Sequence, residues 1–267
     1  METTDFRLRR LLRRASGRSL VVAFDRGVGG DATGGGEDPV AIANAAIDGG
    51  ADGLLVSPGV ARVVRPHLAF RGAPSLLVRC DLMVYGALQP AGTAGVEAEE
   101  YRVLLSPREA AELGADAVVM FLILGNPDDS ITADNMQAVA RAAAEARQVG
   151  IPLIVETVLW GARVDDQADL DALVYVNRLA AELGADAVKT QSPGTVEGMR
   201  RVVEHCPVPV LALGGPRTDS LDDLVADSAV VVDGGAIGLV YGRNIWQAAD
   251  PAGTARALSE MLDTRAS

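Results

Sequence analysis

The chain contains a single lysine, Lys189, and apart from two histidines every other basic side chain is an arginine. Lys189 lies in the apolar segment 185–190. An arginine keeps its proton in a protein, whereas a lysine among apolar groups can lose its proton and attack a carbonyl carbon. Lys189 is therefore a candidate nucleophile. The alternative, which this segment alone leaves open, is a lysine with its stem in the core and its amine in water.

Further charged residues end other predicted strands. Asp25 ends the first of them, and a carboxylate across a pocket from Lys189 would move protons during carbinolamine formation and carbon–carbon cleavage. An aspartate that only caps the following turn is the alternative. Glu156 ends another predicted strand and is a second candidate for proton transfer. Arg26 and Arg79 are candidate substrate contacts at the same end.

Glycines follow the last two predicted strands. Gly214 and Gly215 end the seventh strand, and Gly242 and Arg243 join the eighth strand to a helix predicted to begin near Ile245. Barrel enzymes bind phosphate with these two loops and the N-terminus of a short helix. These four residues are therefore the predicted phosphate site, with Arg243 supplying a charged contact. The alternative is that the glycines only turn the chain tightly.

Short β-branched runs alternate along the chain with alanine-rich helical stretches. Continuous apolar strands separated by helices predict a parallel sheet covered on its faces. Eight such units in 267 residues predict one α/β domain, a (β/α)8 (TIM) barrel. The predicted strands are 20–25, 53–57, 76–80, 117–122, 152–156, 187–190, 208–213 and 237–241.

An internal repeat supports this division. The sequence of 110–118 recurs at 180–188, and 47–53 is a looser third copy. In each copy a helix stops at glycine and the chain enters a strand after Ala-Asp. The repeat is interpreted as structural. It aligns Val119 with Lys189, which places the candidate nucleophile in an otherwise ordinary barrel strand.

The composition limits the classes of function. No apolar run approaches the roughly 18 residues of a membrane span, and the net charge of −12 argues against a nucleic-acid partner. Cys80 and Cys206 lack metal-ligand spacing, which favours a reducing, cytoplasmic setting. His67 and His205 fall on predicted helices and are interpreted as surface residues. No metal and no cofactor is predicted.

Two segments stand apart from the βα rhythm. Residues 1–18 contain a basic amphipathic helix, which we expect to close the bottom of a barrel domain spanning 19–267. Residues 81–105 form the longest insertion, rich in Gly, Pro and Ala, after a strand end. It is a candidate lid over the site, and a plain surface loop is the alternative.

Five segments in order resemble the archaeal-type class I aldolase family (the DhnA-like group) over nearly the whole chain. That family includes fructose-bisphosphate aldolases, 2-amino-3,7-dideoxy-D-threo-hept-6-ulosonate synthases and a thiolase that acts on phosphorylated autoinducer-2. Each segment is weak alone, but the five together at barrel spacing are specific. They are 21–27, 57–62, 184–190, 213–219 and 238–247.

The resemblance implies that Lys189 forms a Schiff base, that Asp25 is an acid/base, and that the four loop residues named above contact phosphate. It implies a metal-independent class I aldolase acting on a phosphorylated ketose such as fructose 1,6-bisphosphate, with a dihydroxyacetone-phosphate-like donor. It also implies a homo-oligomer, such as a pentamer or decamer.

Two departures from the family pattern bear on the substrate. Arg26 stands where the family has histidine after the first strand, and Val158 stands where it has a tyrosine that acts as general acid or base. Valine cannot transfer a proton. The tyrosine's role would pass to Glu156, to Tyr85 or Tyr101 in the insertion, or to water, or the reaction would not need it.

Two alternative functions follow from these departures. One is a biosynthetic aldolase or transaldolase that condenses a sugar-phosphate fragment with an amino-acid semialdehyde, as in the aminodideoxyheptulosonate synthases. The other is a non-catalytic barrel that binds sugar phosphates. The missing tyrosine favours the second, and the retained single lysine speaks against it.

Overall fold

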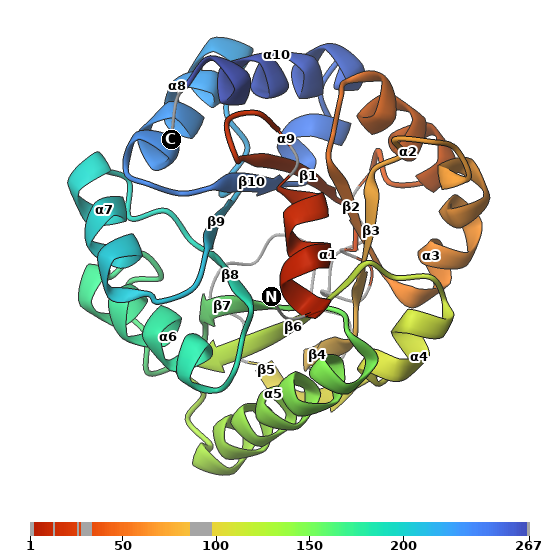
Figure 1. Ribbon diagram of the computed structural model, residues 1–267. Coiled ribbons are helices and arrows are strands. Elements are labelled where there is room, and N and C mark those ends of the chain that lie inside the picture. The colour runs from red at the N-terminus through yellow and green to blue at the C-terminus, as the bar shows by residue number, and fades with distance from the viewer. Residues whose placement is uncertain (1–2, 13, 26, 28–33, 86–97, 266–267) are drawn as a thin grey trace.

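The computed structural model describes residues 3–12, 14–25, 27, 34–85 and 98–265. Among these residues, eight parallel strands close into a barrel in the order β1–β10–β9–β8–β7–β6–β3–β2, and Figure 1 shows the helices around it. The predicted (β/α)8 barrel is confirmed. The barrel strands are β1 (Ser19–Ala23), β2 (Gly53–Val56), β3 (Ser75–Arg79), β6 (Ala117–Leu124), β7 (Leu153–Leu159), β8 (Ala187–Thr190), β9 (Val210–Leu213) and β10 (Gly238–Tyr241).

Polar side chains cap the N-termini of most of the longer helices. Asp38, Ser106, Asp128, Asp169, Thr195, Ser220 and Asp250 each accept a hydrogen bond from a backbone N–H of the first turn, which supplies a partner that the helix itself lacks. The helices are α1 (Thr3–Leu11), α2 (Pro39–Asp48), α3 (Pro58–Val64), the 3₁₀ helix η1 (Arg65–Leu68), α4 (Pro107–Glu112), α5 (Asp129–Val149), α6 (Leu170–Glu182), α7 (Val196–His205), α8 (Leu221–Asp233), α9 (Arg243–Trp246) and α10 (Pro251–Thr264).

Strand residues alternate between two apolar clusters. One cluster fills the barrel and includes Leu77, Val119 and Ile154. The other lies between strands and helices and includes Val78 and Val155. Because successive side chains of a strand point to opposite faces, the position of a residue relative to these two clusters shows whether it faces the barrel interior.

The aspartates of the repeat join neighbouring strands. Asp52, Asp116 and Asp186 stand just before β2, β6 and β8, and each carboxylate accepts from the backbone N–H near the start of the preceding barrel strand. The donors are Leu20 (2.9 Å), Leu76 (3.0 Å) and Leu153 (2.8 Å). Each aspartate N–H donates in return to the carbonyl of the same leucine. The repeat is therefore a strand-pairing device, in agreement with its structural interpretation.

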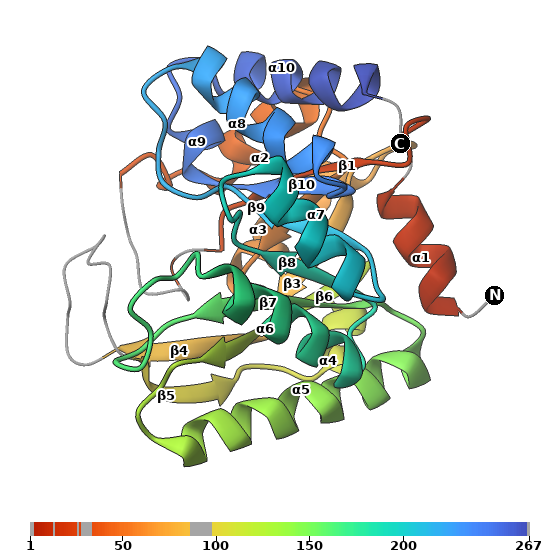
Figure 2. The same cartoon turned by 90° about the vertical axis from the view of Figure 1, so that its left-hand side faces the viewer.

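The N-terminal helix covers the end of the barrel where the strands begin (Figures 1 and 2). Leu8 and Leu11 belong to the cluster inside the barrel. A Cβ atom on Gly53, the first residue of β2, would lie 2.9 Å from Leu11 Cδ1, so glycine makes room for the helix. These contacts support the closing role expected for residues 1–18, which stays a prediction.

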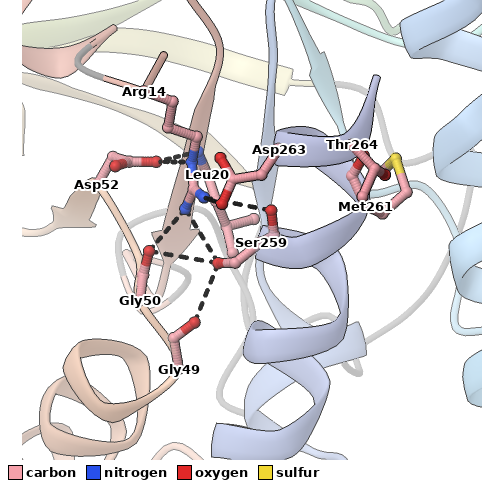
Figure 3. A network of polar contacts seen from close by, with 9 residues as sticks. All are labelled: Arg14, Leu20, Gly49, Gly50, Asp52, Ser259, Met261, Asp263 and Thr264. Carbon is pink, nitrogen blue, oxygen red and sulfur yellow. Dashed lines mark hydrogen bonds and ion pairs between the residues drawn. The ribbon is translucent and has the colours of Figure 1, made fainter. Parts of the chain in front are cut away.

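A polar network next to α1 ties three distant segments together (Figure 3). The guanidinium of Arg14 pairs with Asp52 at 2.5 Å and Asp263 at 3.0 Å. It also donates to the Gly50 carbonyl at 2.6 Å and the Ser259 hydroxyl at 3.0 Å. The network lies at the end of the barrel remote from Lys189, the end that in TIM barrels serves stability.

The long insertion contains two strands that the sequence analysis does not predict. Its described parts form an antiparallel ribbon of β4 (Asp81–Tyr85) and β5 (Ala98–Val103), with Met83 opposite Tyr101, beside α5 in Figure 2. The plain-loop alternative is therefore wrong for these two stretches, and the lid stays a prediction. Residues 86–97 of the candidate lid lie outside the described residues. No helix in the described part of the chain is long and apolar enough to cross a membrane.

Candidate active site

Strand alternation directs five side chains into the barrel near the carboxyl ends of its strands. Asp25, Arg79, Phe121, Glu156 and Lys189 each follow, two positions later, a residue of the inner cluster. Strand register places Glu156 opposite both Phe121 and Lys189. The charged members of this group are all buried. They lie toward the carboxyl ends of the strands, where TIM-barrel enzymes carry out chemistry.

The lysine forms an ion pair with a buried carboxylate. Lys189 Nζ lies 2.7 Å from Glu156 Oε1, and the two residues are 6% and 7% exposed. β8 is apolar around Lys189, as the sequence indicates, but the amine itself faces a charge. Glu156 was predicted to end its strand, whereas β7 continues to Leu159. The carboxylate is therefore held within a paired strand.

A second set of polar contacts supports the lysine from behind. The hydroxyl of Thr157 lies 3.3 Å from the carbonyl of Lys189 and 3.0 Å from Asn177 Oδ1. Asn177 of α6 donates at 2.8 Å to the hydroxyl of Thr190. All four residues are buried, so this network fixes the backbone on either side of the ion pair.

Arg79 links the carboxylates of the site. Its Nε donates to Asp25 at 2.9 Å, and its Nη2 donates to the other oxygen of Glu156. The guanidinium lies 3.7 Å from the ring centroid of Phe121, a cation–π contact. Because Arg79 is 1% exposed and its donors face protein carboxylates, the expected contact between Arg79 and a substrate needs revision. A role in positioning Glu156 and Asp25 fits the structure better.

A further carboxylate extends this cluster outward. Asp81, the first residue of β4, keeps the inward orientation of Arg79 and lies 3.6 Å from its Nη1. The other oxygen of Asp81 accepts from the Tyr101 hydroxyl at 2.9 Å and from the Phe121 backbone N–H at 2.6 Å. Asp81, Arg79 and Glu156 thus stand between Tyr101 and Lys189, so Tyr101 is not placed like the family tyrosine that it was considered to replace.

Burial and charge oppose each other at these groups. Burial alone would raise the pKa of Glu156, but attraction to Lys189 and Arg79 prevails and lowers it to about 2. Burial would lower the pKa of Arg79, whereas Glu156, Asp25 and Asp81 raise it above its ordinary value. For Asp81 burial prevails over Arg79 and the hydrogen bonds, and raises the pKa to about 7. Glu156 therefore stays ionised at neutral pH, while Asp81 titrates there.

The two predicted phosphate loops are joined by one side chain. Asn244 of α9 donates to the carbonyls of Gly214 at 2.9 Å and Pro216 at 3.0 Å, and accepts from the Thr218 N–H at 3.0 Å. α9 starts directly after β10, at Arg243. The loop after β9 and the start of α9 are thus held together, as a two-loop phosphate site requires.

The glycines of these loops also have steric reasons to be glycine. A Cβ atom on Gly242 would lie 2.7 Å from the carbonyl oxygen of Ala23, and one on Gly214 would lie 3.1 Å from the ring of Tyr241. Gly215 has a φ angle of +59°, which favours glycine. The turn-forming alternative therefore accounts for these residue types on its own, and phosphate binding stays a prediction.

Several predicted residues cannot be placed next to the lysine. Arg26 and the side chain of Tyr85 lie outside the described residues. Val158 is 4% exposed and lies two positions after Glu156 on β7.

Cys80 and Cys206 are buried free thiols, and burial raises the pKa of both above the ordinary value.

Sequence reasoning missed three contributors: Asp81, Phe121 and Asn244. The signal for Asp81 was its position two residues after Arg79, which is inward if the strand direction continues. Phe121 was the only aromatic residue in the predicted strand 117–122, a position that inward alternation also selects. Asn244 lay within a recognised segment, but its side-chain contacts depend on where the neighbouring loop passes.

Two surface hollows lie away from this cluster. One, of about 470 Å³, is lined by residues that include Arg10 and Asp116, and the other, of about 440 Å³, by residues that include Arg18 and Ile237. Both are at the end where the strands begin. In the described part of the chain, no three His, Cys, Asp or Glu residues are arranged to hold a metal ion.

Comparison with known proteins agrees with this geometry. An aldolase of Saccharolobus solfataricus is 32% identical, with 94% of this chain and 91% of the relative covered. The 2-amino-3,7-dideoxy-D-threo-hept-6-ulosonate synthase of Halobacterium salinarum is 30% identical, with 92% of this chain and 86% of the relative covered. An archaeal fructose-1,6-bisphosphate aldolase, solved with its catalytic lysine covalently bound to the carbinolamine intermediate, is 28% identical with a TM-score of 0.81, covering 98% of this chain and 99% of that one.

The family assignment rests on most of the chain. The sequence profile of the DeoC/LacD family aldolases matches residues 19–248, which span every strand of the barrel. The resemblance inferred from the five segments is thereby confirmed. Together with the buried lysine at the active end of the barrel, this match shows that the chain belongs to the DeoC/LacD family of aldolases.

Proposed function

We propose that this protein is a class I, Schiff-base aldolase that cleaves or forms a carbon–carbon bond in a phosphorylated ketose such as fructose 1,6-bisphosphate. The observation that carries the proposal is the 2.7 Å ion pair of Lys189 with Glu156 inside the barrel. A buried amine in contact with a carboxylate combines a nucleophile with a group that can carry protons during imine formation. The archaeal aldolase that shares this fold forms a carbinolamine at its catalytic lysine.

In the proposed first step Glu156 takes a proton from the ammonium group of Lys189, and the neutral amine attacks the ketone carbon. The carbinolamine then loses water to give a protonated imine. In the cleavage direction a base removes the proton from the hydroxyl of the carbon beyond the scissile bond. The bond breaks, its electron pair moves into the imine to form an enamine, and an aldehyde leaves. Protonation of the enamine carbon and hydrolysis release the ketone and free Lys189.

Glu156 takes the place of the family tyrosine in this proposal. It touches the lysine, remains ionised at neutral pH, and lies on the same strand as Val158. Asp25 is the second proton carrier, held at 2.9 Å by Arg79. Gly214, Gly215, Gly242 and Arg243 would hold the phosphate, and the fixed distance from phosphate to ketone would present the carbonyl to the amine.

A second candidate is the biosynthetic reaction of the aminodideoxyheptulosonate synthases. The relative from Halobacterium salinarum carries that name, and Val158 removes the tyrosine on which the fructose-bisphosphate reaction of the family depends. The two candidates share the Lys189 imine and differ in the aldehyde partner. Activity assays distinguish the two candidates when the substrates are supplied separately and in combination. The substrates are dihydroxyacetone phosphate, fructose 1,6-bisphosphate and aspartate semialdehyde.

The test is mass analysis of the intact protein after sodium borohydride treatment with dihydroxyacetone phosphate or fructose 1,6-bisphosphate. We expect an adduct on the wild type that maps to the peptide containing Lys189, and none on Lys189→Ala. Lys189→Arg is a matched variant that keeps the charge but cannot form the imine. Ligand binding without an adduct on the wild type would reject the Schiff-base proposal and favour a non-catalytic sugar-phosphate barrel.

The cellular location, the partners and the oligomeric state of the protein are also proposals. The net charge of −12 and the small-molecule site support an enzyme without a nucleic-acid or membrane partner, in the cytoplasm and without a cofactor. The family resemblance supports a homo-oligomer, such as a pentamer or decamer. Light scattering of the purified protein would give the subunit number, and a monomeric mass would reject the assembly proposal.

A further inference from the structure

The β4–β5 ribbon carries charge into the active site. Asp81 and Tyr101 come from facing strands of the ribbon, and both side chains are buried, at 0% and 6% exposure. They contact each other at 2.9 Å and reach the cluster through Arg79. The backbone N–H of Leu104, just after β5, also donates to the carbonyl of Cys80 at 2.7 Å, so the ribbon is joined to the end of β3 at the level of the site.

The cost of burying these groups points to a role beyond packing. A buried ion-pair network is weak evidence for stability, because apolar residues of similar volume usually serve the fold as well or better. Here Asp81 is fully buried, and its Oδ1 lies 3.6 Å from Arg79 Nη1, too far for a hydrogen bond. In its ionised form the carboxylate therefore acts on Arg79 mainly through its charge.

Arg79 is held from several sides. Asp25 accepts from Nε, Glu156 from Nη2, Asp81 faces Nη1, and Phe121 lies against the guanidinium plane. Phe121 also binds Asp81 through its backbone N–H. A planar guanidinium fixed on three edges and one face has a single orientation. That orientation determines where the Oε1 oxygen of Glu156 meets Lys189.

We propose that Tyr101 and Asp81 are positioning residues, which act through Arg79 to hold Glu156 in the geometry that transfers a proton from Lys189. This inference rests on the proposed function. Tyr101 fixes the Asp81 carboxylate, Asp81 fixes one edge of Arg79, and Arg79 fixes Glu156. The ribbon is thereby part of the active site without touching the reacting atoms.

Because Lys189 is the only lysine, the experiment can observe it directly. Protein grown on ¹³C,¹⁵N-lysine, without lysine in any tag, gives NMR signals from one side chain. The variants are Tyr101→Phe, which removes one hydroxyl, and Asp81→Asn, which removes the charge but keeps an acceptor for Phe121 N–H. Tyr175→Phe, at a 59% exposed position on α6, is the matched control. The measured quantities are the Lys189 Cε and Nζ shifts between pH 5 and pH 10.

We expect Tyr101→Phe and Asp81→Asn to move the Lys189 signals and their pH dependence, while Tyr175→Phe leaves them at the wild-type values. The charged and titratable neighbours are Glu156 for Lys189. For Asp81 they are Arg79, Tyr101 and Glu156. The rate of borohydride trapping should fall about 3- to 30-fold in both variants, while the KM for the phosphorylated substrate stays unchanged. In the double variant the fold-loss in trapping rate should be smaller than the product of the two single losses.

Wild-type Lys189 signals in folded Tyr101→Phe and Asp81→Asn protein would overturn the inference. If one variant does not fold, the other decides, since each breaks the path at a different contact. The NMR measurement needs no turnover, so failure of this inference is distinguishable from failure of the proposed function, which would appear as a missing borohydride adduct on the wild type.

Discussion

At the scale of single residues, the site depends on the environment of one amine. Lys189 is the only lysine of the chain, and the sequence predicts an apolar surrounding that would free its amine of a proton. The structure instead places the Glu156 carboxylate 2.7 Å from Nζ. In the proposed mechanism, release of the proton from Lys189 therefore involves this neighbouring carboxylate and not burial alone. This is a different physical route to the same nucleophile.

Glu156→Gln tests that route. The amide keeps the size of the side chain but cannot accept the proton, so kcat should fall by about 10²- to 10⁴-fold, the range for loss of a general base, while KM changes little. Steady-state kinetics and the rate of borohydride trapping measure both effects. Glu197→Gln, on the exposed side of α7, is the control. Equal activity of both variants would remove Glu156 from the mechanism.

Arg243→Ala tests the predicted phosphate site. Loss of a charged hydrogen bond of about 1.5–3 kcal/mol should raise KM for a phosphorylated substrate by about 10- to 100-fold, with a smaller change in kcat. Arg200→Ala on α7 is the matched control. A KM that stays at the wild-type value would place the phosphate elsewhere and leave the loop glycines with their steric roles alone.

At the scale of elements, two segments outside the eight βα units serve opposite ends of the barrel. α1 packs Leu8 and Leu11 into the end where the strands begin, and the β4–β5 ribbon reaches the end where they finish. The helix was expected from its amphipathic pattern. The ribbon was not, because the insertion is rich in Gly, Pro and Ala and its strands pair only with each other.

Leu11→Ala measures the closing contact of α1. Leu11 is 2% exposed, and a buried leucine truncated to alanine costs about 2–5 kcal/mol of unfolding free energy. Urea denaturation would show this as a lower midpoint. Leu12→Ala, at a half-buried neighbour, should cost clearly less. Similar midpoints for the two variants would contradict a sealing role for the helix.

The ribbon should make stability depend on pH through Asp81. Its pKa is raised from 3.8 to about 7 in the folded protein, so the folded state binds the proton more tightly than the unfolded state. This contribution is favourable at low pH and is lost as pH rises from about 4 to about 7, on the order of 4 kcal/mol. Asp81→Asn should remove that slope, which urea midpoints at pH 5 and pH 8 would show. An unchanged slope in the variant would assign it to other groups.

At the scale of the whole molecule, one kind of hydrogen-bonded contact between neighbouring barrel strands recurs along the chain. Asp52, Asp116 and Asp186 each exchange hydrogen bonds with the preceding barrel strand. A charged acceptor on a buried N–H is a strong hydrogen bond. The repeat thereby sets the register of strand pairs at the end remote from the site, and chemistry is left to the opposite end.

Asp186→Ala tests this contact just before β8, the strand that carries Lys189. It leaves the N–H of Leu153 without its side-chain acceptor, which should lower the unfolding free energy by about 1–3 kcal/mol. Thermal or urea unfolding measures the loss, and Asp165→Ala on an exposed loop is the control. Because Asp186 lies at the start of β8, KM and kcat at 25 °C should stay near the wild-type values. A stability equal to that of the control would show that the strand pairing does not need the carboxylate.

The sequence by itself determined the barrel, the family and the candidate lysine. Strand and helix periods, glycine stops and residue types are local properties, and each can be seen within a few positions of the chain. The tertiary structure alone decided the Arg79 cluster. Arg79 meets Asp25 across 54 residues and Glu156 across 77, and its ribbon partners lie in a segment without a periodic signal. Such contacts follow from strand register and side-chain direction in the closed barrel, which no local pattern encodes.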